Sequence, residues 1–188
     1  DLDGDGSSDQ VRVVTIADSK YVTVETSYSG NLVWKEFGEW GSYSASDIAV
    51  TPEFGTDVNQ DGANELWLKI NPLTGPAGGA KEHYVYVFQD CELQVVNDAE
   101  ATPYNFYRGN TVSGETFYID CVTENGEALL LYHEDYRIGE PGDFVWAYVP
   151  TALRLTGTTF EEVISSSFED DISPAPDPLP TDNCPKVS

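Results

Sequence analysis

Two short segments of the chain carry oxygen-bearing side chains at the same spacing. Residues 1–9 (DLDGDGSSD) place aspartate at positions 1, 3, 5 and 9, and residues 57–65 (DVNQDGANE) place Asp, Asn, Asp and Glu there. Alternate positions direct side-chain oxygens inward when such a loop wraps around an ion, and glycine at position 6 permits the sharp turn. The spacing therefore predicts two sites for a hard cation, for which calcium is the natural candidate.

Each loop is predicted to supply five oxygen donors, four from side chains and one from the carbonyl of position 7. The predicted ligands are Asp1, Asp3, Asp5, Ser7 and Asp9 in the first loop, and Asp57, Asn59, Asp61, Ala63 and Glu65 in the second. Calcium takes about six to eight oxygens, so each loop provides most of a coordination sphere. Without a cation the carboxylates repel one another, which makes metal-free acidic turns the less favoured interpretation.

The elements that hold these loops are predicted to be strands. An EF-hand is excluded because position 12, which should be a glutamate, is Arg12 in one loop and Leu68 in the other. Runs rich in β-branched and aromatic residues indicate short strands, and no segment shows a sustained helical pattern beyond a short turn at residues 44–49. These runs lie at residues 11–13, 21–25, 66–70, 84–88, 128–132, 144–148 and 153–155.

A third and weaker copy of the loop stands at residues 121–129, where the glycine is in register but the ligand positions are not acidic. We predict no metal at this copy. The three copies begin 56 and 64 residues apart, which indicates a repeat of three units. We therefore expect an all-β fold of three antiparallel β-sheet units, at about residues 1–56, 57–117 and 118–165, followed by a proline-rich acidic tail at 166–188.

The loops resemble the FG-GAP/VCBS-type calcium-binding repeats, in which a D-x-[DN]-x-D-G-x-x-[DE] loop precedes an apolar strand, as in integrin-like β-propellers. The resemblance covers residues 1–16 and 56–70, and more weakly 118–132. It implies that the ten residues named above are calcium ligands and that the three units are propeller-like blades. Three blades are fewer than a closed propeller usually has. An incomplete propeller, a compact three-bladed body, a sandwich and closure by another chain all remain open.

Charge and composition limit the partners. The chain has 188 residues, with 33 acidic against 9 basic side chains and a formal net charge of −24. Nucleic acid and anionic membranes would be repelled, whereas cations would be attracted. No apolar run is long enough to insert into a membrane. The chain begins inside the first loop, which we interpret as a processed product whose targeting segment has been removed, and we expect an extracellular location.

The three cysteines suggest one disulfide bond and one remaining thiol. We predict a bond between Cys91, at a turn after a strand, and Cys121, at the start of another strand. Cys184 lies in the tail, where it could be free or paired within or between chains. An alternative is that all three are thiols.

No catalytic motif is present, so we do not expect an enzyme. His83 and His133 are interpreted as ordinary surface or edge residues. The favoured function is structural or adhesive, as a building block of an extracellular assembly that forms a homo-oligomer or filament or meets a glycan or surface protein. The alternatives are a carbohydrate-binding module, with Tyr104, Phe106 and Tyr107 as its platform unless they fill the core, and a degenerate extracellular hydrolase domain.

Overall fold

The computed structural model describes residues 1–27, 32–37, 39–40, 43–73, 81–108, 117–138 and 145–163. These residues are all-β, as the sequence predicts, and the one helical element among them is a short 3-10 turn, η1 (Ala45–Asp47). It falls within the predicted helical turn at residues 44–49. None of the described residues belongs to a helix with the length and apolar character needed to cross a membrane. The predicted tail at 166–188 lies outside the described residues.

Three antiparallel sheets make up the body of the molecule. The first sheet has the order β1 (Gln10–Ile16), β2 (Ser19–Glu25) and β3 (Leu32–Phe37). The middle sheet has the order β10 (Phe106–Arg108), β8 (Lys81–Gln89), β7 (Glu65–Pro72) and β6 (Ile48–Thr56), with β9 (Glu92–Val95) also paired to β8. The third sheet has the order β11 (Phe117–Glu124), β12 (Glu127–Ile138), β13 (Val145–Thr156) and β14 (Thr159–Val163). A short ladder joins β4 (Glu39–Trp40) to β5 (Tyr43–Ser44).

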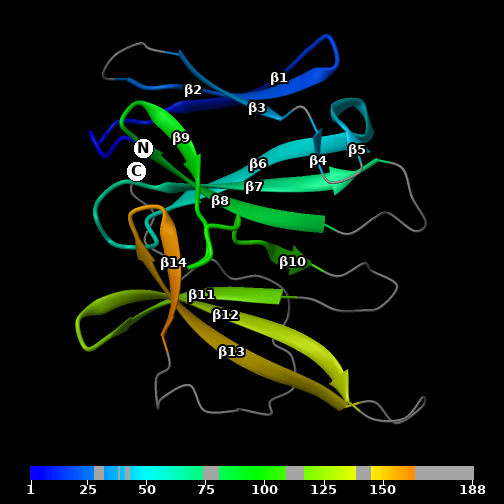
Figure 1. Cartoon of the computed structure of the whole chain (residues 1–188). Helices are drawn as coiled ribbons and strands as arrows, with labels where there is room; N and C mark the ends of the chain where they lie inside the picture. Colours follow the sequence, from blue (N-terminus) through cyan, green and yellow to red (C-terminus); the bar gives the residue numbers. More distant parts are fainter. Residues whose placement is uncertain are drawn as a thin grey trace.

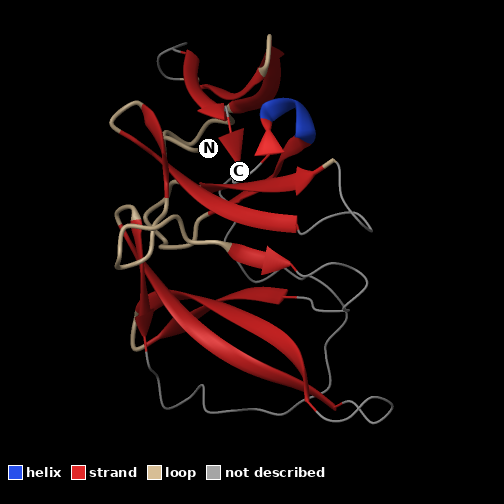
Figure 2. Cartoon of the chain, turned by 45° about the vertical axis from the view of Figure 1, so that its right-hand side comes forward, coloured by secondary structure: helices blue, strands red, loops and turns tan. Residues whose placement is uncertain are grey.

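The three sheets lie one above another, with the middle sheet between the other two (Figures 1 and 2), and none closes into a barrel. Their boundaries differ from the predicted units. Strand β6 ends at Thr56 and pairs with β7, so the predicted boundary between residues 56 and 57 falls inside the middle sheet. The second loop connects these two strands.

The weak third copy of the loop is a β-hairpin. Strands β11 and β12 pair up to Glu124 and Glu127, and the two residues between them, Asn125 and Gly126, have φ of 52° and 83°. Asn-Gly with two positive φ values is the preferred two-residue hairpin turn. The sequence similarity at residues 121–129 therefore reflects a shared glycine turn and a following strand.

Two hydrophobic cores separate the layers. The upper core, between the first and middle sheets, contains Leu2, Val22, Val24, Phe37, Ile48, Val50, Leu66, Leu68, Ile70, Tyr84, Tyr86 and Leu93. The lower core, between the middle and third sheets, contains Val58, Trp67, Val85, Val87, Val96, Phe106, Ile119, Leu130, Tyr132, Leu153, Leu155 and Phe160. Side chains alternate between the faces of a strand, so β7 contributes Leu66 and Leu68 to one core and Trp67 to the other. This explains why β7 is apolar at successive positions instead of at alternate ones.

The predicted disulfide bond between Cys91 and Cys121 is wrong. Cys91 is an exposed free thiol in the two-residue turn between β8 and β9, where Asp90 and Cys91 have φ of 54° and 60°. Cys121 lies on β11, packs against the lower core and is disulfide-bonded to a partner outside the described residues. A side chain at the exposed tip of a hairpin does not meet one that packs into the core. Cys184 also lies outside the described residues.

Candidate metal centre

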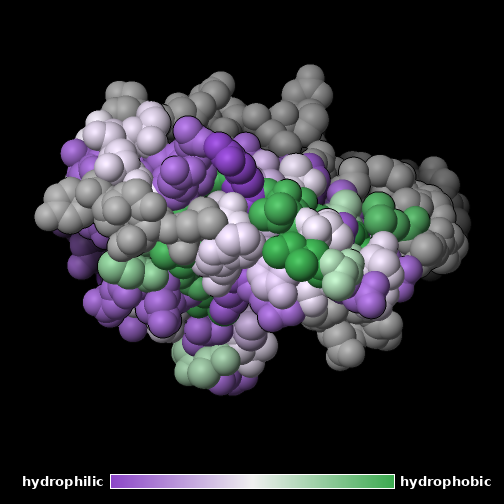
Figure 3. Space-filling view, turned by 90° about the horizontal axis from the view of Figure 1, so that it is seen from above, coloured by the Kyte–Doolittle hydropathy of each residue, from purple (hydrophilic) through white to green (hydrophobic). Residues whose placement is uncertain are grey.

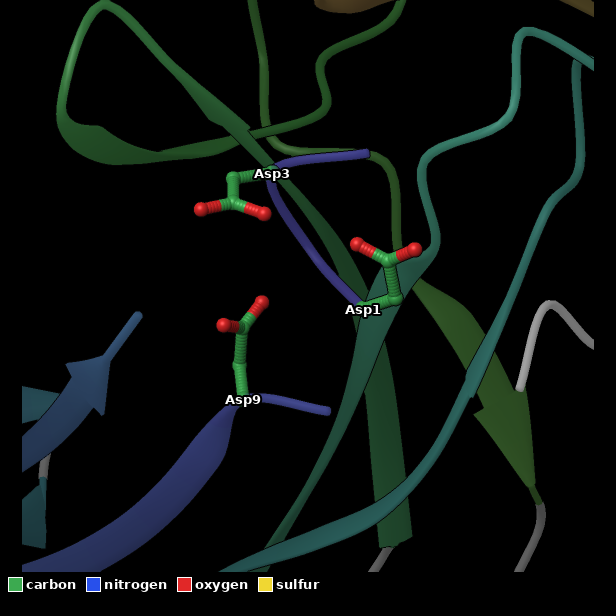
Figure 4. A group of neighbouring side chains, drawn as sticks. All are labelled: Asp1, Asp3 and Asp9. Carbon is green, nitrogen blue, oxygen red and sulfur yellow. The ribbon is translucent and has the colours of Figure 1, made fainter. Parts of the chain in front are cut away.

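The first loop, residues 1–9, leads into β1 and brings three of its predicted ligands together. Asp1, Asp3 and Asp9 each place a carboxylate oxygen within 4.8 Å of the others. Figure 4 shows the three carboxylates facing a common space. One of these oxygens, Oδ1 of Asp1, is buried and has no hydrogen-bond partner among the described residues. A buried oxygen of this kind is what a cation would satisfy.

Four backbone N–H groups hold the carboxylates of the first loop in place. The donors belong to positions 2, 6, 5 and 7, and the acceptors to positions 9, 1, 3 and 5. The contacts are Leu2 to Asp9 at 2.6 Å, Gly6 to Asp1 at 2.9 Å, Asp5 to Asp3 at 3.2 Å and Ser7 to Asp5 at 2.8 Å.

The second loop, residues 57–65, repeats all four contacts at the same positions. They are Val58 to Glu65 at 2.6 Å, Gly62 to Asp57 at 3.1 Å, Asp61 to Asn59 at 3.0 Å and Ala63 to Asp61 at 2.9 Å. In addition, the Asn59 amide donates to Asp61 Oδ2 at 2.9 Å. The two loops, 56 residues apart, therefore fold on one scaffold of hydrogen bonds.

The backbone conformation explains why both loops can turn so sharply. Positions 4 and 6 are left-handed in both: Gly4 and Gly6 have φ of 72° and 85°, and Gln60 and Gly62 have φ of 59° and 97°. Glycine adopts this region without the steric cost that a side chain brings. Position 2 anchors each loop, because Leu2 is buried in the upper core and Val58 in the lower core.

Two of the three carboxylates of the second loop are more deeply buried than any in the first, whereas Asp61 is exposed. Asp57 is 4% exposed and Glu65 is 3% exposed. Burial, with a smaller contribution from repulsion by Asp61 and Asp57, raises the pKa of Glu65 to about 8 against the opposing hydrogen bond from Val58. Burial also raises the pKa of Asp57. Burial therefore opposes the ionised form of both groups, and most strongly that of Glu65, and a nearby cation would favour the ionised form.

The first loop is more open and has a partner that sequence reasoning missed. Ser27, just after β2, donates its hydroxyl to Asp5 Oδ2 at 2.7 Å and its N–H to Asp9 Oδ1 at 3.1 Å. The Ser27 hydroxyl and the Ser7 N–H lower the pKa of Asp5, which is exposed. Since Ser27 is 18 residues from Asp9, no local spacing in the sequence signals this contact.

A cavity of about 280 Å³ opens beside the second loop. Four predicted ligands form part of its wall, together with Leu2 from the first loop and Phe88 from β8; these ligands are Asn59, Asp61, Ala63 and Glu65. The donor set at both loops is oxygen only, which suits a hard cation such as calcium. The residue types at both loops therefore fit the predicted ion, but of the two loops only the first brings three carboxylates within 4.8 Å of one another in the described part of the chain.

Of the two interpretations of the aromatic cluster, core packing is confirmed at Phe106 and the alternative of a carbohydrate platform is wrong there. Phe106 is fully buried in the lower core, with ring centroids 5.1 Å from Trp67 and 5.2 Å from Tyr132. Tyr104 packs beside it at 4.9 Å, and the side chain of Tyr107 lies outside the described residues. This cluster fills a sheet core, as aromatic residues in β proteins commonly do.

Aromatic exposure occurs instead on the outer face of the first sheet. Trp34 on β3 is 48% exposed, and Val14 and Ile16 are also exposed on β1, at the other edge of the same sheet. Figure 3, seen from above, shows apolar groups on this side of the molecule among hydrophilic ones. The rings of Trp34 and Tyr21 meet edge to face, at 5.7 Å and 79°, so they do not form the coplanar pair that would stack on a sugar.

The expectation that His83 is an ordinary surface or edge residue is also wrong, because β8 lies inside its sheet and the side chain is buried. His83 is 3% exposed, on β8, and its Nε2 lies 2.9 Å from Oε2 of Glu53. Lys69 on β7 contacts the other oxygen of Glu53. Glu53 reaches both because it occupies the irregular position of β6, between Pro52 and Phe54, where the pairing with β7 shifts register. The side chain of His133 lies outside the described residues.

Comparison with known proteins identifies no relative. The chain matches no protein-family model, and searches of curated proteins and of solved structures found no match either. The resemblance to FG-GAP/VCBS-type repeats therefore stays a prediction that depends on the two loops.

Proposed function

We propose that this chain is a secreted or cell-surface β-sheet protein that two calcium ions stabilise, with a structural or adhesive role. The observation that carries the proposal is the set of four hydrogen bonds that recurs at identical positions in the two loops. In the first loop, the carboxylates of Asp1, Asp3 and Asp9 also come within 4.8 Å of one another. Among physiological cations, calcium is the one that suits a flexible oxygen-only site of this size.

The proposed role for calcium is to neutralise the charge of the buried carboxylates, so that their ionised forms no longer oppose folding. Asp57 and Glu65 are almost completely buried, and ionising them without a counter-ion opposes folding. Binding that requires the folded loop adds its free energy to folding. Extracellular calcium modules work at dissociation constants of about 0.1 to 1 mM, which agrees with a location outside the cell.

The structural role is supported by the shape of the sheet stack. Open sheets keep edge strands that can pair with another chain, and β6 and β14 are the last strands of their sheets. This supports assembly into a homo-oligomer or filament of propeller-like units. The carbohydrate-binding alternative has less support, because the burial of Phe106 removes its platform.

A thermal melt with and without calcium tests the proposal. At a calcium concentration about 100 times the dissociation constant, two sites should raise Tm by about 10 °C or more relative to excess chelator. The matched variants are Asp57→Asn, which should abolish part of the shift, and Asp18→Asn, outside the loops, which should keep all of it. An identical Tm in calcium and in chelator would exclude the proposal.

A further inference from the structure

The two loops touch each other through the backbone. The N–H of Asn64, at position 8 of the second loop, donates to the carbonyl of Asp1, at position 1 of the first, over 2.8 Å. The backbone at Gly4 faces the second loop closely enough that an added Cβ would lie 3.5 Å from the Cβ of Ala63. Leu2 lines the cavity beside the second loop.

We infer that the two loops bind calcium as one coupled unit, in which an ion in either loop raises the affinity of the other. This inference rests on the proposed function and adds to it how the sites are regulated. The hydrogen bond between Asn64 and Asp1 connects the ligand set of one loop to the ligand set of the other. Asp1 is a ligand of the first loop, and Asn64 is the direct neighbour of Glu65, a ligand of the second.

The coupling follows from what each ion would order. An ion bound to Glu65 fixes the chain at residues 64–65 and so fixes the N–H group that holds Asp1. The next residue, Leu2, donates its own N–H to Asp9, so the same short segment orients two ligands of the first loop. The second ion then binds a loop that is already ordered, so its binding costs less conformational entropy. This is the condition for positive cooperativity.

Repulsion between the two cations opposes this coupling. The first loop carries four carboxylates and the second carries three, so each loop remains negative when it holds one divalent ion. Exposed charges are also screened over about 8 Å at physiological ionic strength. Ordering should therefore exceed repulsion when binding is measured at about 0.15 M salt.

Position 5 offers a matched pair of variants for the test. Asp5→Asn and Asp61→Asn each remove one charge from an exposed ligand and keep an oxygen that can accept from position 7. The full chain and both variants are titrated with calcium alone by calorimetry. Each variant should bind one ion. The overall association constant for two ions in the unaltered chain should exceed the product of the single-site association constants of the two variants by about fivefold or more.

A second measurement reports on the contact itself. In saturating calcium, hydrogen exchange of the Asn64 amide should be about tenfold faster in Asp5→Asn than in the unaltered chain, because its acceptor is no longer ordered. If the unaltered chain binds two ions and its overall binding constant equals the product of the two single-site constants, the coupling is overturned and the proposed function stays intact. An absence of calcium binding in the unaltered chain would overturn both.

Discussion

The first and second loops share one hydrogen-bond scaffold but differ in burial. In the first loop, the carboxylates of Asp1, Asp3 and Asp9 are half-buried and Asp5 is exposed. In the second, Asp57 and Glu65 are almost completely buried. The spacing of ligands and glycines fixes the scaffold, whereas the surrounding layers decide how strongly the carboxylates need a counter-ion.

The difference arises from where each loop joins its sheet. The first loop precedes β1, the edge strand of the first sheet, and water reaches its carboxylates. The second connects two paired strands of the middle sheet, which has a core on each face. Loss of calcium should therefore affect the second loop more than the first.

Substitution at position 9 gives the largest expected contrast. In saturating calcium, Glu65→Gln should lower the free energy of unfolding by about 3 kcal/mol, because it removes a proposed calcium ligand whose side chain is buried. Asp9→Asn should lower it by about 1 kcal/mol or less, because water and Ser27 compensate at the more open loop. Urea unfolding of both variants measures the difference.

The same pair should reverse its order in excess chelator. Glu65→Gln should then be more stable than the unaltered chain at pH 9, because a buried charge without a counter-ion has been removed. Asp9→Asn should be within about 0.5 kcal/mol of the unaltered chain. Equal effects of the two substitutions in both conditions would show that burial does not distinguish the loops.

Glu53 sharpens the comparison, because it is a carboxylate whose cationic partners are already part of the protein. Burial opposes its ionisation, but hydrogen bonds and charges from His83 and Lys69 outweigh burial and lower its pKa to about 2. A lowered pKa gives stability that is present above the ordinary value of 4.5 and lost as the pH falls toward 2.

The predicted loss over that pH range is about 1 to 2 kcal/mol, since the side chain is partly exposed to solvent. Glu53→Gln should lack this part of the acid-induced loss, which urea unfolding at pH 5 and pH 3 can measure in chelator. If Glu53→Gln shows the same pH dependence as the unaltered chain, the ion pairs do not stabilise the fold.

Glycine at position 6 gives the smallest effect and tests whether the scaffolds are equivalent. Gly6→Ala and Gly62→Ala should each cost about 1 kcal/mol, because both residues have positive φ. A Cβ at either position meets no atom within 4 Å, so packing adds nothing to the cost. Denaturant unfolding should give the same value for both within about 0.5 kcal/mol, and a much larger cost at one loop would show that the scaffolds differ.

Much of the fold could be predicted from the sequence because strand signals are local. The apolar run at residues 66–70 and the ligand spacing of both loops need only neighbouring residues. What depends on distant contacts was missed, such as the Ser27 hydroxyl on Asp5 and the burial of His83. Cys91 was assigned to a disulfide because the sequence shows a turn but not the direction in which its tip points.

The contact between Asp1 and Asn64 also has a consequence for the order in which the chain folds during synthesis. The first loop is made first, yet the group that seats it is added 63 residues later, and the upper core that buries Leu2 requires strands of the middle sheet. During synthesis, the inner face of the first sheet therefore stays uncovered until the middle sheet emerges. The first loop is made before the second but is completed only after it.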